Sequence, residues 1–172
     1  SEMCIRDSYN PTPDFSYGLN VYLEYKNFDF TMFWQGVQGV DIISDLKKQT
    51  DIWAGLNIGF LNKGQRLLDA WSSTNPNSNI PALSLSDNNN EKRVSTYWVE
   101  NGSYLKLRTI QLGYNLPKSM TNRLAMQRLR FYLSAQNLLT IHSKSFTGVD
   151  PENPNYGYPI PLNITFGINV TF

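Results

Sequence analysis

The sequence has few charges, one cysteine, one histidine and no long apolar run. Of its 172 residues, 17% are charged and the formal net charge is +1, so the scattered basic residues predict no nucleic-acid-binding surface. The single cysteine, Cys4, excludes an internal disulfide and a thiolate cluster for zinc. Because no apolar run approaches the roughly 18 residues that a membrane-spanning helix needs, a helical membrane protein is excluded as well.

The sequence also lacks the residue patterns of an active site. His142 is the only histidine, so a multi-histidine metal site cannot form, and we interpret this residue as part of a loop or rim. No pair of candidate acid and base side chains falls in a recognisable catalytic motif. The sequence therefore predicts neither an enzyme nor a bound metal or cofactor.

Aromatic residues, by contrast, are abundant. They make up 13% of the chain, yet the mean hydropathy is only -0.38. This combination allows a transmembrane β-barrel, because barrel strands alternate apolar and polar residues and the loops between them are polar.

The clearest strand pattern lies in residues 162–172. Apolar and polar residues alternate there without a break, and successive side chains of an extended strand point to opposite faces. One face carries Ile164, Phe166, Ile168, Val170 and Phe172, and the other carries Thr165, Gly167, Asn169 and Thr171. A tilted strand needs about 9 to 11 residues to cross a bilayer, so the pattern predicts a strand between lipid and water.

A hairpin is predicted near the start of the chain. Its first strand is Phe15–Tyr25, its two-residue turn is Lys26-Asn27, and its second strand runs from residue 28 to about 35. Asn tolerates the left-handed conformation that such turns require. This register sets Glu24 opposite Asp29, and facing like charges are unfavourable. Three explanations are open: Lys26 neutralises the pair, water reaches it, or a bulge shifts the register.

Two further strands are predicted at Tyr104–Asn115 and at residues 128–138, joined by a connection with a short helical turn in residues 119–126. Strict alternation in the first of them would place Lys106 and Arg108 on the lipid side. A cation costs about 2 to 4 kcal/mol at mid-membrane and much less near the interface. We therefore expect both residues at the outer rim, unless a bulge redirects them.

Long polar segments separate these strands. Residues 36–102 and 143–161 lose the alternation and contain turn clusters, with helical spacing in residues 41–52 and 62–71. If the chain ends on the periplasmic side, both long loops fall outside and the short connections fall inside. Short inner and long outer connections are typical of outer-membrane barrels. The predicted fold is therefore all-β, with antiparallel up-and-down strands in a barrel wall and long extracellular loops that contain short helical pieces.

The outer loops hold the candidate contact residues. Trp53 and Trp71 are candidates for contact with substrate or a partner, since aromatic rings stack on sugar rings. Asp150 and Glu152 could offer oxygen ligands to calcium, but a turn stabilised by Asp and Pro is the better interpretation. A second pair of tryptophans is assigned to a girdle at the membrane interface, and this pair is Trp34 and Trp98.

Several segments together resemble a known family. They are WVENGSYLKLR (98–108), LGYNLP (112–117), LRFYLSAQNL (129–138), GVDPE (148–152) and the closing Phe172. In their order and spacing they resemble the C-terminal barrel segment of SusC/RagA-type TonB-dependent outer-membrane transporters of Bacteroidota. The resemblance covers residues 9–172. Residues 1–8 fit no strand pattern and no signal peptide, so we expect them to be a non-native scar of cloning or sequence assembly.

The resemblance implies import of oligosaccharides or peptides through a plugged barrel in the cell outer membrane. It implies as partners a SusD-like surface lipoprotein, the TonB energy-coupling complex, the barrel-assembly machinery and outer-membrane lipid. It also implies that the closing strand, through Phe166, Ile168, Val170 and Phe172, is read as an assembly signal. About five strands cannot close a barrel, since bacterial single-chain barrels start at about eight. The chain is therefore expected to be a fragment without the plug, the coupling box and the earlier strands.

Two other interpretations are open. One is a different transporter class, either a siderophore-type receptor or a passive porin. The other is a soluble β-sandwich that binds carbohydrate and uses its aromatic face as a core.

Overall fold

The computed structural model describes residues 9–51, 64–84, 95–154 and 157–172. The expected non-native residues 1–8 lie outside this part of the chain, as does Trp53.

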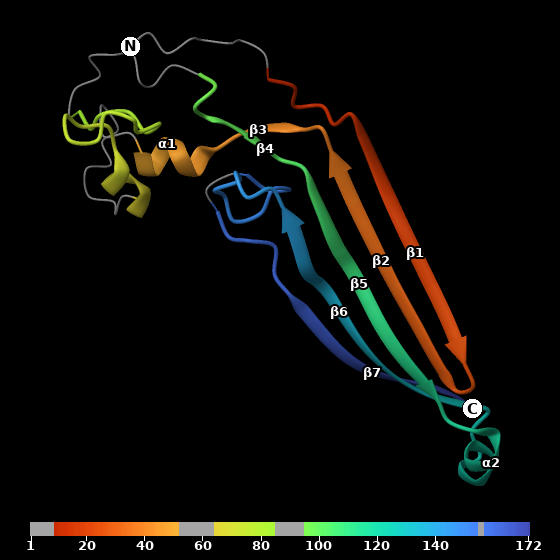
Figure 1. Ribbon diagram of the computed structural model, residues 1–172. Coiled ribbons are helices and arrows are strands. Elements are labelled where there is room, and N and C mark those ends of the chain that lie inside the picture. The colour runs from red at the N-terminus through yellow and green to blue at the C-terminus, as the bar shows by residue number, and fades with distance from the viewer. Residues whose placement is uncertain (1–8, 52–63, 85–94, 155–156) are drawn as a thin grey trace.

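The main element is a five-stranded antiparallel sheet in the order β1-β2-β5-β6-β7. Its strands are β1 (Phe15–Tyr25), β2 (Phe28–Gln38), β5 (Tyr104–Asn115), β6 (Arg128–His142) and β7 (Asn163–Thr171). Each strand pairs with the next one in the sheet, and Figure 1 shows them as long, curved neighbours. The prediction of an all-β, up-and-down arrangement is confirmed. β2 and β6 run three and four residues beyond their predicted ends at residues 35 and 138.

The β1–β2 hairpin has the predicted register. Tyr25 pairs with Phe28, and Glu24 lies opposite Asp29. In the turn between them, Lys26 adopts the left-handed conformation, with φ of 56°. The expectation that Asn27 would take this conformation is wrong, although the two-residue length of the turn is right.

One face of the sheet is apolar and open. Side chains from all five strands line up across it, for example the row Leu23, Phe30, Leu112, Leu133 and Phe166. The exposed fractions of Leu23, Leu133 and Phe166 are 58%, 51% and 67%. Among the described residues, therefore, no second layer covers this face.

A bulge at Arg108 changes which residues of β5 share a face. On the β2 side, Phe33 pairs with Thr109 but Trp34 pairs with Leu107, so Arg108 is an extra residue without a partner in that ladder. An extra residue breaks the two-residue period and turns the preceding side chains over. Lys106 consequently lies opposite Gln35 on the polar face, and Leu107 joins the apolar face. The bulge that the sequence analysis allowed for is therefore present, and it redirects Lys106.

The connections carry short elements at the two ends of the sheet. Figure 1 shows β3 (Asp41–Ile43), β4 (Val99–Asn101) and α1 (Asp45–Asp51) at one end, and α2 (Lys118–Thr121) at the other. η1 (Gln65–Asp69) and η2 (Asn122–Leu124) are single 3-10 turns. The helical segments expected within residues 41–52, 62–71 and 119–126 are therefore present but shorter.

β3 and β4 pair with each other as a separate two-stranded sheet that the sequence did not predict. Trp98 precedes β4 and is 2% exposed, packed against Ile43 and Tyr97. The assignment of Trp98 to an interface girdle is wrong, because its ring forms the centre of a small loop core. No helix in the described part of the chain is both long and apolar enough to cross a membrane.

Candidate functional site at one end of the polar face

The face of the sheet opposite the apolar one is predominantly polar. One of its rows contains Tyr22, Thr31, Gln111, Ser134 and Thr165. At the end of the sheet near β3 and β4, two long connections meet this face. We call the described residues 39–51, 64–84 and 95–103, between β2 and β5, the first connection and the described residues 143–154 and 157–162, between β6 and β7, the second connection.

Lys106 fastens the second connection to the sheet. Its Nζ donates to Asp150 Oδ1 and Oδ2 at 3.0 and 2.9 Å and to Glu152 Oε2 at 2.9 Å. The side chain of Lys106 is fully buried. Burying an ammonium group without partners would cost a large amount of free energy. Lys106 can therefore be buried only because the two carboxylates pair with it. The arrangement depends on the bulge, which turns Lys106 onto this face.

Arg108 adds a second cation to the same cluster. Its Nε donates to Gln35 Oε1 at 2.8 Å, and its Nη2 pairs with Glu152. Burial by itself would raise the pKa of Glu152, but the hydrogen bonds from Arg108 and Lys106 outweigh it and hold that pKa below its ordinary value. Glu152 therefore stays ionised in the folded protein at neutral pH.

Asp150 also shapes the turn that carries it. Its side chain accepts a hydrogen bond from the backbone N–H of Glu152 at 3.0 Å, and its carbonyl accepts one from the N–H of Asn153 at 3.0 Å. The interpretation as a turn stabilised by Asp agrees with this geometry. Both carboxylates face cations, and the described residues contain no group of three or more side chains that could hold a metal ion.

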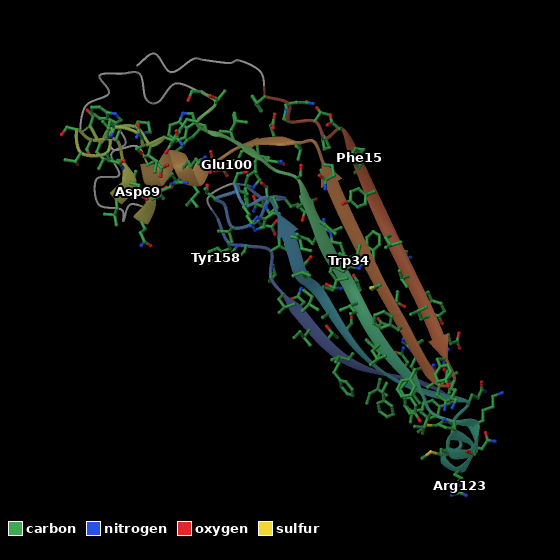
Figure 2. All side chains as sticks on the ribbon, in the orientation of Figure 1. Phe15, Trp34, Asp69, Glu100, Arg123 and Tyr158 are labelled. Atoms are coloured by element: carbon green, nitrogen blue, oxygen red, sulfur yellow. The ribbon has the colours of Figure 1, made fainter. Side chains whose placement is uncertain are left out.

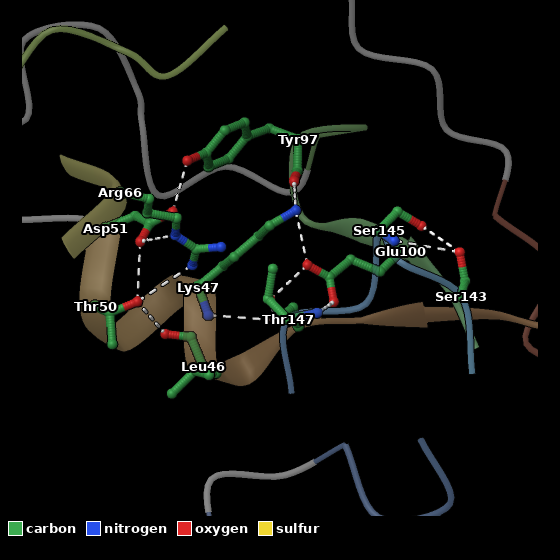
Figure 3. Close-up of polar contacts among 11 residues, drawn as sticks. Leu46, Lys47, Thr50, Asp51, Arg66, Tyr97, Glu100, Ser143, Ser145 and Thr147 are labelled. Atoms are coloured by element: carbon green, nitrogen blue, oxygen red, sulfur yellow. Dashed lines mark hydrogen bonds and ion pairs between the residues drawn. The ribbon is translucent and has the colours of Figure 1, made fainter. Parts of the chain in front are cut away.

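Glu100 joins the first connection to the second. Its Oε2 accepts the backbone N–H of Thr147 at 2.9 Å, and its Oε1 accepts the Thr147 hydroxyl at 2.6 Å. Lys47, from α1, pairs with the same Oε1 at 2.8 Å and donates to the carbonyl of Tyr97 at 3.1 Å. Figure 3 shows Glu100 between Lys47 and Thr147, with α1 on one side and the second connection on the other.

A neighbouring group of polar side chains holds the first connection together. Asp51 accepts from Arg66 Nε at 2.8 Å and from the hydroxyl of Tyr97 at 2.6 Å. Burial raises the pKa of Tyr97, and the hydrogen bond to Asp51 raises it further, so the hydroxyl remains a donor. These bonds tie α1, η1 and the segment before β4 to one another (Figure 3).

A separate charge pair lies at the other end of the polar face. Arg130 on β6 donates from Nε to Asp29 Oδ1 on β2 at 3.0 Å and also pairs through Nη2. Asn115 donates to the same Oδ1 at 3.1 Å. Arg130 thus neutralises Asp29 where it faces Glu24. The Lys26 ammonium instead lies 5.2 Å from the centre of the Tyr25 ring.

Of the residues predicted to contact substrate or a partner, Asp150 and Glu152 lie together in the Lys106 cluster, and Trp53 lies outside the described residues. Figure 2 shows Glu100, Asp69 and Tyr158 toward one end of the molecule and Arg123 at the opposite end. Trp71, in the first connection, is 48% exposed. The expected assembly residues Phe166, Ile168, Val170 and Phe172 are 67%, 51%, 41% and 78% exposed, and the first three share the apolar face of β7.

The sequence-based predictions missed Glu100, Lys47 and Thr147, and they missed the partnership of Lys106 with Asp150 and Glu152. An available signal was the opposite charge of the two pairs Lys106/Arg108 and Asp150/Glu152. This charge pattern alone does not predict the contact, because it does not indicate that the bulge turns Lys106 toward the carboxylates.

The chain is similar to proteins of known name and to solved structures. No protein-family model matches the chain. It is 35% identical to TonB-dependent receptor P3 and 32% identical to TonB-dependent receptor P26 of Formosa agariphila, in each case over 95% of this chain. The matches span only 17% of the length of each receptor.

Solved structures with the same fold are chains of the RagAB peptide importer. The closed-closed state matches with a TM-score of 0.79 at 28% identity, covering 97% of this chain and 18% of that chain. The open-open state matches with a TM-score of 0.77 at 27% identity, with the same coverage. The relatives are thus named as receptors and importers rather than as enzymes.

Proposed function

The chain is homologous to TonB-dependent receptors, and we propose that residues 9–172 form the C-terminal part of the barrel wall of such a transporter in the outer membrane. The whole transporter would import nutrients with energy supplied by the TonB complex. The observation that carries this proposal is the two-faced sheet, because an apolar face open on five strands fits lipid and a polar face fits a water-filled lumen. The matches over nearly the full chain support it.

The proposed cargo is a peptide or an oligosaccharide. The peptide is supported by the likeness to the RagAB peptide importer, whereas the names of the two receptors specify no cargo. A SusD-like surface lipoprotein is the proposed partner on the outer side, where the two long connections would lie. The barrel-assembly machinery and outer-membrane lipid are the other proposed partners.

The proposed barrel placement can be tested with spin labels in the full-length protein. Leu133 and Gln136 lie on opposite faces of β6, and both are exposed. Each is replaced by cysteine, in Leu133→Cys and in Gln136→Cys, to carry a label. A label at position 133 should be relaxed mainly by oxygen, which concentrates in lipid. A label at position 136 should be relaxed mainly by a water-soluble nickel complex. Equal access of the nickel complex to both positions would contradict the barrel placement.

The transporter class needs a separate experiment. Uptake of labelled peptides and oligosaccharides by cells should stop when the gene for TonB is deleted, while the level of the receptor in the outer membrane stays the same. A passive porin would continue to conduct without TonB. Uptake of an iron chelate, with no uptake of peptide or oligosaccharide, would instead favour a siderophore-type receptor.

A further inference from the structure

The two long connections meet through buried charges. Glu100 belongs to the first connection and Thr147 to the second, 47 positions apart in the sequence. The side chain of Glu100 is only 1% exposed, and it accepts two hydrogen bonds from Thr147 while it pairs with Lys47. The hydroxyls of Ser44 and Thr147 add a further hydrogen bond of 3.2 Å across the same junction.

Neither connection satisfies these groups alone. Without Thr147, the carboxylate of Glu100 would keep only Lys47 among these partners in a site that excludes water. Hydrogen bonds to a charged group are stronger than neutral ones, and a buried charge that loses a partner is strongly destabilising. The position of each connection therefore depends on the other being in place.

The second connection has an independent attachment to the sheet. Lys106, on β5, is fully buried against Asp150 and Glu152, and Arg108 pairs with Glu152 as well. The Glu100–Thr147 junction and the Lys106 cluster hold different residues of the second connection, at positions 147 and 150–152. Substitutions can therefore remove the two contacts one at a time.

We propose that the first and second connections move as one body, joined to each other at Glu100 and fastened to the sheet at Lys106. A force or a ligand acting on either connection would then displace both. The proposal adds a conformational device to the proposed transporter. Its test measures distances rather than uptake, so it can fail while the proposed function stands, and the reverse also holds.

The test uses the full-length protein in detergent, with one spin label in each connection. Leu68→Cys and Val149→Cys are suitable substitutions, because residues Leu68 and Val149 are 83% and 62% exposed. We expect a single narrow distance distribution between them. In Glu100→Ala the narrow distance distribution should be replaced by a broad one. In Thr147→Val the distribution should broaden to a smaller extent. Asp69→Ala, which removes an exposed acidic side chain of the first connection, should leave it unchanged.

A second label pair separates the junction from the attachment to the sheet. Distances from Val149→Cys to Gln136→Cys on β6 should broaden in Lys106→Met, because Asp150 and Glu152 lose their common cation. In the same variant, the distance between positions 68 and 149 should stay narrow. Heat-modifiable migration in gels shows whether each variant is a folded barrel. A narrow distribution between positions 68 and 149 in a folded Glu100→Ala variant would overturn the proposal, as would a broad one in the protein without these substitutions.

Discussion

Gly113 is the residue that allows a charge pair to cross a strand. Asp29 on β2 and Arg130 on β6 are separated by β5, and they meet over Gly113, which has no side chain. A Cβ at this position would fall on the carboxylate of Asp29 and the guanidinium of Arg130. The pair and the glycine therefore depend on each other.

Gly113→Ala should destabilise the barrel by about 1–3 kcal/mol, the usual cost of overpacking, because the two charges must move apart. Urea unfolding of the full-length protein in detergent checks this value. The matched control is Gly18→Ala on β1, where the nearest atom to the new Cβ is a Phe33 ring carbon at 3.2 Å, at the far end of a side chain. Equal effects of the two substitutions would show that the charge pair is not the cause.

Glu152 makes the second connection sensitive to acid. Its pKa is lowered in the folded protein, so its ionised form contributes stability at pH values above the ordinary value of about 4.3. That contribution is lost as the pH falls through the lowered pKa. The mobility of a spin label at Val149→Cys should therefore rise below about pH 4.3. In Glu152→Gln the label should be more mobile already at neutral pH, with a smaller change on acidification, and an identical pH response in both proteins would refute this assignment.

Individual ion pairs could not be predicted from the sequence, and Lys106 shows why. Strict alternation places it with Ile110 on the apolar face, and only the bulge at Arg108 moves it to the polar face. The two consecutive polar residues Arg108 and Thr109 are a local sign that the alternation shifts, but the position of the bulge depends on how β5 pairs with β2 and β6. Asp150 and Glu152 were recognised as candidates, but their partners come from a strand more than 40 positions away.

At the scale of elements, strands with long alternation were predictable and short ones were not. β1 and β5 begin and end at the predicted residues, because strands of 11 and 12 residues in which apolar and polar side chains largely alternate give a strong signal. β3 and β4 have three residues each and are stabilised by pairing with each other. Three residues are too few for a period of two to stand out from the polar sequence around them.

β7 carries a prediction about assembly. Phe166, Ile168 and Val170 lie on its apolar face, and Phe172, which follows the strand, is 78% exposed. If this strand is read as an assembly signal, deleting Phe172 should lower the amount of full-length protein inserted in the outer membrane. Quantitative blotting of membrane fractions measures the loss. Deleting Tyr158, which is 96% exposed in the second connection, is the control and should leave insertion unchanged. Undiminished insertion without Phe172 would count against the signal.

At the scale of the whole molecule, the sheet has two open edges. β1 and β7 are the outermost of the five strands, and each has only one neighbour within the described residues. Exposed strand edges invite pairing with other chains, and the exposed apolar face beside them adds a second cause of association. In a closed barrel, neighbouring strands would cover both edges and lipid would cover the face.

The isolated 172-residue chain should therefore associate in water and become monodisperse only in detergent. Its sheet leaves Phe15, Leu23 and Phe166 between 58% and 67% exposed, and covering such side chains is worth about 25 cal/mol per Å² of apolar surface. Sedimentation velocity with and without detergent makes the comparison. A matched variant with Leu23→Ser, Leu133→Ser and Phe166→Ser removes one row of the apolar face and should associate less. A cooperative melt of a soluble monomer without detergent would contradict the barrel segment and favour a β-sandwich, since in that fold the same aromatic face would be buried as a core.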